Sequence, residues 1–294
     1  MTDFSDLIHA RDLIQWSTAL YSDVDGTLVP ASNQISPLVV QEIGRFVDAG
    51  FHFTLATGRN FAGVQRLLRS VPITDPIVLC NGAYVYDPST KKDAYVSITS
   101  ETAQHLLSRL TRLTNIVVYV DTADHTFWVS RVSATTEPYA MLEQLNPRLF
   151  TDPNEVTLHH DIIKIGVKLL DASQQTRLQL EELFNDIERE LPQQLHYCFS
   201  NPSYLEFMQA GVSKWSGIQS SQRLKSQRQD DVLIAVGDEH NDLEMVKQAH
   251  IGVAMGNAVD AVKHAAHHCI GTVDEDGMAH FLRYLRTQIQ AISS

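Results

Sequence analysis

Cysteine, long apolar runs and positive charge are all scarce in this sequence of 294 residues. Its three cysteines, Cys80, Cys198 and Cys269, lie far apart and form no CxxC pair. This spacing excludes a disulfide framework and a cysteine-based zinc site. No stretch approaches the roughly eighteen consecutive apolar residues of a membrane-spanning helix, and the first residues lack the basic start and apolar run of a signal peptide. We therefore expect a cytoplasmic protein with no membrane partner.

Basic residues are outnumbered, with 23 Lys and Arg against 35 Asp and Glu, so the net charge is −12. An acidic chain repels nucleic acid, which excludes a general nucleic-acid binder. The same field repels phosphorylated small molecules, so a site for them needs a local lysine or a bound cation. Hydrophobic residues make up 44% of the chain, which is a globular composition. At about 150 residues per domain, the length predicts two domains, with one large α/β domain as the alternative.

Strands alternate with helices at both ends of the chain, which predicts a parallel sheet with helices on both faces. Ser36 and Pro37 have the residue types of a helix start, and Gly50 marks the matching end. In the first part we expect strands at 19–22, 51–56 and 76–80, and helices at 37–50 and from 59 to about 70. In the last part we expect helices at 213–225 and 243–249, and strands at 232–237 and 251–254.

The middle of the chain has a different pattern, with strands in pairs. We expect strands at 83–86, 94–98, 116–120, 127–132, 162–170, 195–199 and 204–208, and helices at 102–113 and 174–191. Paired strands with helices between them predict an α+β insert. The predicted fold is therefore α/β, with a Rossmann-like parallel-sheet core made of residues 1–86 and 210–294 and an inserted domain at 87–209.

Polar residues follow the predicted core strands directly, where open parallel sheets bind their ligands. The clusters are Asp23 to Thr27, Thr57 to Arg59, the helix start at Lys214, and Gly237 to Asp242. Together they supply carboxylates, a hydroxyl, an ammonium and an amide. This set suits a hard divalent cation and a phosphoryl group. One carboxylate can attack phosphorus while a second one moves protons.

Several segments resemble the Cof-type (class IIB) phosphatases of the haloacid dehalogenase-like superfamily. The segments are SDVDGTLV at 22–29, LATGR at 55–59, NGAYVYD at 81–87, YLEFMQAGVSK at 204–214, VGDEHNDLEM at 236–245, GVAMGNAVDAVKHAA at 252–266, and Asp276-Gly277. Their order and spacing cover nearly the whole chain after residue 18. The resemblance implies that the insert is a C2-type cap domain over a catalytic core. The chain departs from the family pattern at Trp215, where a small residue is usual, and at Glu239-His240.

The resemblance also implies a role for each matching residue. Asp23 is the expected nucleophile, which becomes an aspartyl-phosphate, and Asp25 is the expected acid and base. The expected Mg²⁺ site comprises Asp23, Asp25 through its carbonyl, Asp238 and Asp242. Of these, Asp242 is expected to orient Lys214 or a metal-bound water. The expected phosphate-binding groups are Val24, Thr57, Gly58, Lys214 and Asn241.

The favoured function is therefore a magnesium-dependent phosphatase of small phosphorylated metabolites, with sugar phosphates as the first candidates. A phosphomutase and a non-catalytic sensor of a phosphorylated ligand remain as alternatives. A phosphomutase needs arginines in the cap to hold a phosphorylated product; the insert has Arg109, Arg112, Arg131, Arg148, Arg177 and Arg189. We expect a monomer or weak homodimer.

Three groups of residues stay open at this point. Arg59 has either a salt bridge or a role at the site. Residues near the return from the insert are candidates for contact with substrate: Lys164, Asn201, Tyr204 and Glu206. The spacing of His264, His267 and His268 suggests one helical face, but no carboxylate or thiolate partner has zinc spacing. We expect these histidines to be solvated or locally bonded.

Overall fold

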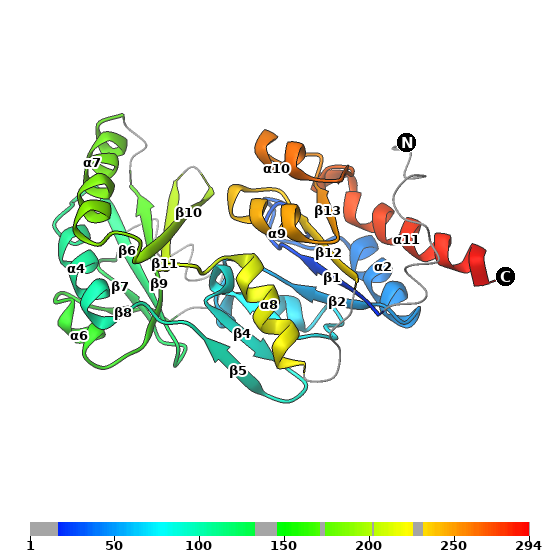
Figure 1. Ribbon diagram of the computed structural model, residues 1–294, viewed down its shortest axis with the longest axis horizontal. Helices are drawn as coiled ribbons and strands as arrows, with labels where there is room; N and C mark the ends of the chain where they lie inside the picture. The colour runs from blue at the N-terminus through cyan, green and yellow to red at the C-terminus, as the bar shows by residue number, and fades with distance from the viewer. Residues whose placement is uncertain (1–16, 133–145, 171–173, 202, 226–231, 294) are drawn as a thin grey trace. The chain divides into compact units, whose positions relative to one another are not determined.

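The chain divides into two compact units, each described here by itself in a computed structural model (Figure 1). Residues 17–132, 146–170, 174–201, 203–225 and 232–293 are described. The core unit comprises Met1–Thr57, Gln65–Ala94 and Lys214–Ser294, and the insert unit comprises Gly58–Val64 and Tyr95–Ser213. The first sixteen residues of the predicted core domain lie outside the described residues. We retain 1–86, 210–294 and 87–209 as proposed domain limits.

The core unit is built on a parallel sheet with the strand order β14-β13-β12-β1-β2. The strands are β1 (Thr18–Ser22), β2 (His52–Leu55), β12 (Val232–Gly237), β13 (Ile251–Ala254) and β14 (His268–Cys269). Each neighbouring pair is parallel. β1 and β13 are buried along their whole length, as expected for strands with helices on both faces. The predicted α/β fold class is confirmed.

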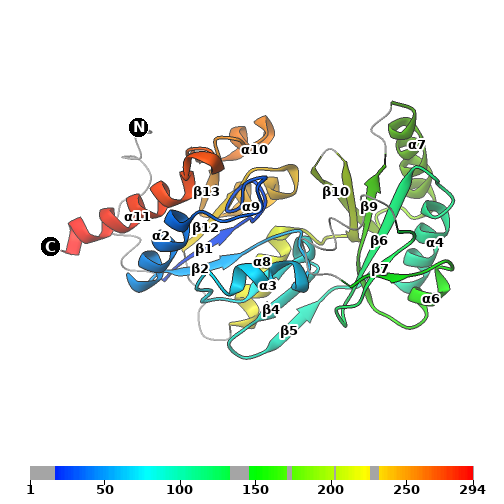
Figure 2. The same cartoon turned by 180° about the vertical axis from the view of Figure 1, so that it is seen from behind.

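Helices cover both faces of this sheet (Figures 1 and 2). They are α2 (Pro37–Asp48), α3 (Phe61–Leu68), α8 (Lys214–Leu224), α9 (Leu243–Gln248), α10 (Asp260–Ala265) and α11 (Gly277–Ser293). The connections from β1 to β2 and from β12 to β13 run in opposite directions across the sheet. Right-handed crossovers therefore place α2 and α9 on opposite faces. α11 packs against α2, and α8 packs against α9.

The third expected strand, at 76–80, pairs differently from the prediction. β3 (Ile77–Leu79) belongs to a smaller sheet with β4 (Tyr84–Asp87) and β5 (Lys92–Tyr95), and β3 and β4 are antiparallel. An isolated parallel bridge between Ala56 and Val78 connects this sheet to the end of β2. The turn before β5 is stabilised by Asp87, whose Oδ1 accepts a hydrogen bond from the amide of Ser89 at 2.8 Å. β5 begins at Lys92 and ends at Tyr95, so both limits come earlier than those of the predicted strand at 94–98.

The insert unit has a mostly antiparallel sheet with the strand order β10-β11-β9-β6-β7-β8. The strands are β6 (Ile116–Thr122), β7 (Phe127–Val129), β8 (Arg148–Leu149), β9 (Ile162–Leu169), β10 (Leu195–Asn201) and β11 (Tyr204–Gln209). Its helices are α4 (Ser100–Leu110), α6 (Asn154–Thr157) and α7 (Gln174–Glu190). The predicted α+β character of the insert agrees with this arrangement.

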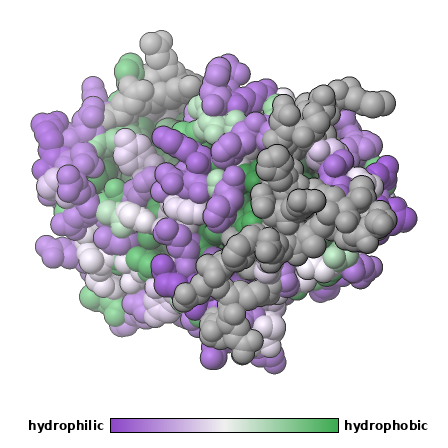
Figure 3. Space-filling model, turned by 45° about the vertical axis from the view of Figure 1, so that its right-hand side comes forward, coloured by the Kyte–Doolittle hydropathy of each residue, from purple (hydrophilic) through white to green (hydrophobic). Residues whose placement is uncertain are grey.

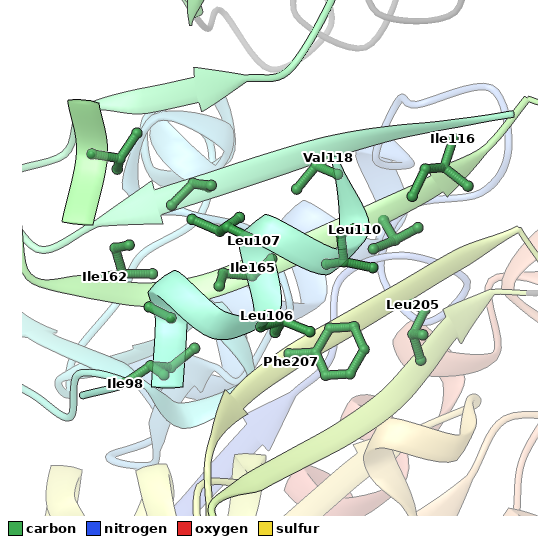
Figure 4. Close-up of a cluster of buried hydrophobic side chains, with 14 of the residues drawn as sticks. Ile98, Leu106, Leu107, Leu110, Ile116, Val118, Ile162, Ile165, Leu205 and Phe207 are labelled. Atoms are coloured by element: carbon green, nitrogen blue, oxygen red, sulfur yellow. The ribbon is translucent and has the colours of Figure 1, made fainter. Parts of the chain in front are cut away.

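One face of the insert sheet packs against these helices (Figure 4). Leu106, Leu107 and Leu110 of α4 are fully buried against the strands. Val118, Ile165 and Phe207, from β6, β9 and β11, meet them in the same cluster, which also includes residues of α6 and α7. Burying a leucine side chain stabilises a fold by roughly 2 kcal/mol, so this cluster gives the insert unit a hydrophobic core of its own.

Some elements were not expected from the sequence, including α11, α10 and the short strand β14. The helical placement of His264, His267 and His268 on one face is wrong, because α10 ends at Ala265 and His268 lies in β14. Nδ1 of His267 accepts a hydrogen bond from the amide of Gly252 at 2.9 Å, and Nδ1 of His264 lies 2.7 Å from the carbonyl of Asp260. The local bonding expected for these two histidines is confirmed.

The hydropathy of the surface and the burial of the cysteines bear on the expectations from composition. Hydrophilic side chains predominate in the described part of the face that Figure 3 shows. No helix in the described ranges combines the length and the hydropathy needed to cross a bilayer. Cys80 is buried, while Cys198 and Cys269 are partly exposed.

A buried carboxylate joins α2 to α11 and generates the first prediction. Glu42 is 1% exposed, and its Oε1 accepts hydrogen bonds from Arg45 at 2.8 Å and Arg283 at 2.9 Å. Burial by itself raises the pKa of Glu42, but the hydrogen bonds from Arg283 and Arg45 outweigh it and lower this pKa.

We predict that Glu42→Gln lowers the free energy of unfolding by about 1–2 kcal/mol at neutral pH, since it removes charge-assisted hydrogen bonds to partly exposed arginines. The stabilisation by Glu42 requires its ionised carboxylate, so the difference in free energy of unfolding between wild type and variant should shrink as the pH falls below about 4. Urea unfolding at several pH values measures this difference. Glu182→Gln on the exposed side of α7 is the control; an equal loss there, or a pH-independent gap, contradicts the assignment.

Candidate active site

The site begins where β1 and β12 end side by side (Figure 1). Ser22 is in register with Val236, and the amide of Asp23 donates to the carbonyl of Val236 at 2.9 Å. Asp23 and Asp238 therefore leave the sheet at the same edge, at the carboxyl ends of their strands. Both side chains are buried, at 5% and 7% exposed.

Lys214, the first residue of α8, is buried among these carboxylates, with 1% of the residue exposed. Its Nζ donates to Oδ1 of Asp23 at 2.6 Å and to Oδ1 of Asp242 at 2.5 Å. Burial by itself lowers the pKa of Lys214, but the two carboxylates outweigh burial and raise it. Lys214 is therefore a charged ammonium inside the protein and not a solvated surface lysine.

Asp238 adds a further carboxylate to this cluster. One carboxylate oxygen from each of Asp23, Asp238 and Asp242 lies within 4.8 Å of the others. Burial, together with the charge of Asp242, raises the pKa of Asp238 to about 7, although the hydroxyl of Thr27 donates to it at 2.9 Å. Burial also raises the pKa of Asp23 well above its usual range, against the opposing effect of Lys214. The ionised cluster thus has more negative charge than Lys214 offsets.

Asp242 is held by the protein itself through both carboxylate oxygens. Its Oδ2 accepts from the amides of Asp238 at 2.8 Å and Glu239 at 3.0 Å, while its Oδ1 accepts from Lys214. A Cβ atom at Gly237 would lie 2.4 Å from Cγ of Asp242, so this close approach requires glycine. The contacts favour a role for Asp242 in orienting Lys214 and the loop after β12.

The turn after Asp23 is shaped around Asp238. Gly26 has a φ of +80°, and a Cβ atom there would lie 2.2 Å from Oδ2 of Asp238. Nδ2 of Asn257 donates to the carbonyl of Gly26 at 2.9 Å. The carbonyl of Val24 accepts from later amides of the turn, while Asp25 lies exposed on the turn.

Asn81 makes hydrogen bonds to two of the expected phosphate-binding residues, Thr57 and Asn241. The amide of Asn81 donates to the carbonyl of Thr57 at 3.0 Å, and Nδ2 of Asn241 donates to Oδ1 of Asn81 at 3.0 Å. Asn81 is 1% exposed and has a φ of +55°, a conformation that asparagine tolerates better than most residues. Asn81 lies in the quoted segment NGAYVYD, but the sequence assigned it no role.

Other site residues escaped the sequence reasoning too. Thr27 contacts Asp238 directly, and Asn257 contacts the Gly26 turn. Both lie inside the quoted motifs, at DGT and GNA, so a signal was present although no role was assigned to either residue.

The remaining candidates belong to the insert unit. Gly58 accepts from Nζ of Lys164 at 2.8 Å through its carbonyl, and Lys164 also binds Glu206 at 2.7 Å. Nη1 of Arg59 donates to the carbonyl of Gly63 at 3.0 Å. Nζ of Lys168 lies 4.1 Å from the ring centroid of Tyr204. The side chain of Asn201 lies outside the described residues.

Comparison with known proteins decides the family, since the family model described as haloacid dehalogenase-like hydrolase matches residues 20–282. The chain belongs to this family. The hydrolase is 27% identical to a Bacillus subtilis 5-amino-6-(5-phospho-D-ribitylamino)uracil phosphatase, with 89% of this chain and 94% of the relative covered. It is 25% identical to the pyridoxal phosphate phosphatase of Escherichia coli, with 88% and 95% covered.

Solved structures show the same fold. A haloacid dehalogenase-like hydrolase from Bacteroides thetaiotaomicron aligns with a TM-score of 0.76 at 24% identity, covering 92% of this chain and 99% of the other. One from B. subtilis aligns with a TM-score of 0.77 at 21% identity, covering 91% and 99%. The resemblance to Cof-type phosphatases is confirmed, and so is the prediction of a phosphoric monoester hydrolase of this family.

The contact between Gly26 and Asp238 generates the second prediction. Gly26→Ala should lower the stability of the hydrolase by about 1–3 kcal/mol, because the methyl group enters the space of Asp238 and the positive φ is strained. It should also reduce hydrolysis of para-nitrophenyl phosphate at least tenfold. Gly211→Ala is a matched control, because Gly211 has the same φ of +80° with nothing within 4 Å of its added Cβ. Equal losses in both variants would show that backbone strain, and not Asp238, is responsible.

Proposed function

We propose that this hydrolase removes the phosphate group from small phosphorylated metabolites, with Mg²⁺ as cofactor and an aspartyl-phosphate intermediate on Asp23. The observation that supports the proposal most strongly is the buried contact of Lys214 with Asp23 and Asp242, beside the carboxylate of Asp238. A buried ammonium in this position offsets charge that the acidic chain otherwise directs against a phosphate.

In the proposed reaction, a carboxylate oxygen of Asp23 attacks phosphorus and the bond from phosphorus to the leaving oxygen breaks. Asp25 gives a proton to that oxygen. A water molecule then attacks phosphorus, Asp25 takes the water's proton, and the bond between Asp23 and phosphorus breaks to release inorganic phosphate. Lys214 stabilises charge on the phosphoryl oxygens in both steps. Thr57, Asn241 and the amides of Val24 and Gly58 are the proposed partners of the other oxygens.

The donor set fits a magnesium ion. Its atoms are carboxylate and carbonyl oxygens, which this cation prefers, and burial makes the ionised cluster costly without added positive charge. Asp23, Asp238 and the carbonyl of Asp25 are the proposed ligands. Asp242, whose oxygens already accept three hydrogen bonds, is proposed to act beside them. A bound Mg²⁺ supplies the charge that reduces repulsion between Asp23 and the phosphate.

The substrate class is proposed from chemistry and from the names of relatives. Sugar phosphates were the first candidates, and relatives are named for pyridoxal phosphate and for a phosphorylated ribitylaminouracil. These molecules share a phosphate monoester on a small polar body. A screen of such monoesters with Mg²⁺ is therefore the experiment that decides among them.

The contacts of three cap arginines, Arg109, Arg131 and Arg148, give the phosphomutase alternative no support. Arg109 binds Glu190 at 3.0 Å and Asp186 at 3.2 Å, and Arg131 donates to backbone carbonyls at 2.8 and 3.0 Å. Arg148 lies over the ring of Trp128, 5.6 Å from its centroid. These cations bind groups of their own unit. A cytoplasmic location and a monomer or weak homodimer stay predictions.

The third prediction concerns the nucleophile. Asp23→Asn should lower kcat by several orders of magnitude, since an amide does not form the acyl phosphate. Its thermal unfolding should stay close to that of wild type, because the substitution preserves shape and removes a buried charge. Asp48→Asn, on the exposed end of α2, is the control. Wild-type turnover by the Asp23→Asn variant would refute covalent catalysis by this residue.

The fourth prediction concerns the cation. Chelation with EDTA should abolish hydrolysis and added Mg²⁺ should restore it, because no His or Cys belongs to the cluster. Calorimetric titration should show one Mg²⁺ site, and Asp238→Asn should lower its Mg²⁺ affinity at least tenfold. Asp260→Asn, which replaces an exposed acid at the start of α10, should leave the Mg²⁺ affinity unchanged. Full activity after exhaustive chelation would overturn the proposed cofactor.

A further inference from the structure

The chain passes from the core unit to the insert unit at the bond between Thr57 and Gly58. Residues 58–64 come soon after β2, which ends at Leu55, yet their contacts place them with the insert unit. Gly58 therefore lies between β2 and α3, at the start of a segment that also includes the first residues of α3. Because glycine has no side chain and an unusually wide range of φ and ψ, its backbone orientation depends on what surrounds it.

A buried ion cluster of the insert sheet surrounds this segment. Asp121, Lys164 and Glu206 come from the adjacent strands β6, β9 and β11, and they are 5%, 4% and 7% exposed. Asp121 is directly opposite Lys164, while Glu206 is opposite Gly166, whose position is on the same face as Lys164. Nζ of Lys164 lies 2.7 Å from Oε1 of Glu206 and 3.3 Å from Oδ2 of Asp121.

The same cluster holds the segment by two hydrogen bonds. Nζ of Lys164 donates to the carbonyl of Gly58 at 2.8 Å, and Nδ2 of Asn60 donates to Oδ1 of Asp121 at 2.7 Å. Oδ1 of Asn60 in turn accepts from the amide of Gly63 at 3.0 Å, in the first turn of α3. Gly58 and Asn60 are therefore both held by charged groups of the insert sheet.

The ammonium of Lys164 has three hydrogens to donate, and oxygen atoms of Gly58, Glu206 and Asp121 all lie within 3.3 Å of it. A ligand that bound this ammonium would have to displace one of them. Burying three charged groups is costly, and hydrophobic residues of similar size would often stabilise a fold at least as well. The cluster therefore points to a requirement for a defined geometry at Gly58.

We propose that Lys164 is a positioning residue that orients Gly58, and through it the Thr57–Gly58 peptide whose amide is assigned to the substrate phosphate. This inference rests on the proposed function, in which that amide binds a phosphoryl oxygen. It gives Lys164, which the sequence suggested as one of four candidates for contact with substrate, a positioning role instead. A positioning role acts on the phosphate group, which all substrates share, so the loss on substitution should not depend on the leaving group.

The test compares Lys164→Met with wild type on two substrates, para-nitrophenyl phosphate and the metabolite turned over best. We expect kcat/KM to fall about tenfold for both, and the inhibition constant of inorganic phosphate to rise by a similar factor. Lys164→Arg should recover part of both losses, because it keeps a donor and the charge. Arg109→Met, which removes ion pairs between α4 and α7 of the same unit, is the control and should change neither value.

Asn60→Ala provides a second variant that preserves the buried charges, and it should show a smaller loss of the same uniform kind. A loss confined to the metabolite, with unchanged phosphate inhibition, would mean that Lys164 recognises the leaving group and would overturn the positioning role. Wild-type phosphate affinity in both variants would overturn it too. If wild type hydrolyses neither substrate, the proposed function fails; calorimetric binding of inorganic phosphate then still tests whether Lys164 acts on the phosphate site.

Discussion

The site depends on one interaction, the buried ammonium of Lys214 between the carboxylates of Asp23 and Asp242. These residues come from the end of β1, the start of α8 and the short helical turn after β12. An unpaired ammonium at this depth would lose several kcal/mol of hydration free energy, so the three segments are constrained to meet. The contact therefore fixes the relative positions of chain segments 191 and 28 residues away from Lys214, before any ligand binds.

Two glycines and the backbone amides after β12 position the other carboxylates of the site. Gly237 leaves room for Asp242, and Gly26 leaves room for Asp238. The amides after β12 bind the second oxygen of Asp242, so this carboxylate fixes both Lys214 and the loop that carries Asp238. This loop holds the carboxylates of Asp238 and Asp242 close together in a buried position. Such an arrangement lowers the stability of the fold, as is common at functional sites. A positive charge bound beside these carboxylates would reduce the repulsion between them.

Much of the core unit was predictable from local pattern. β12 and β13 have the predicted limits, because each is an apolar run that ends at a polar motif. The partner of β3 was not predictable, since strand propensity does not say which edge a strand joins. Asn81 was missed for a similar reason: its role comes from Asn241, 160 residues later. α11 was missed although its signal is present, with buried Met278, Phe281, Leu282 and Leu285 at helical spacing.

Each unit contains a buried lysine with two carboxylates, and the difference between the two clusters explains their different chemistry. Around Lys164, the third acceptor is the neutral carbonyl of Gly58, so the ammonium is satisfied within the protein. Around Lys214, the additional neighbour is Asp238, another carboxylate, whose pKa burial raises to about 7. When its carboxylates are ionised, that cluster has more negative charge than Lys214 offsets, and oxygen atoms of this kind are the ligands that a hard cation prefers. The first arrangement is complete in itself and suits a structural attachment, whereas the second suits the proposed cation.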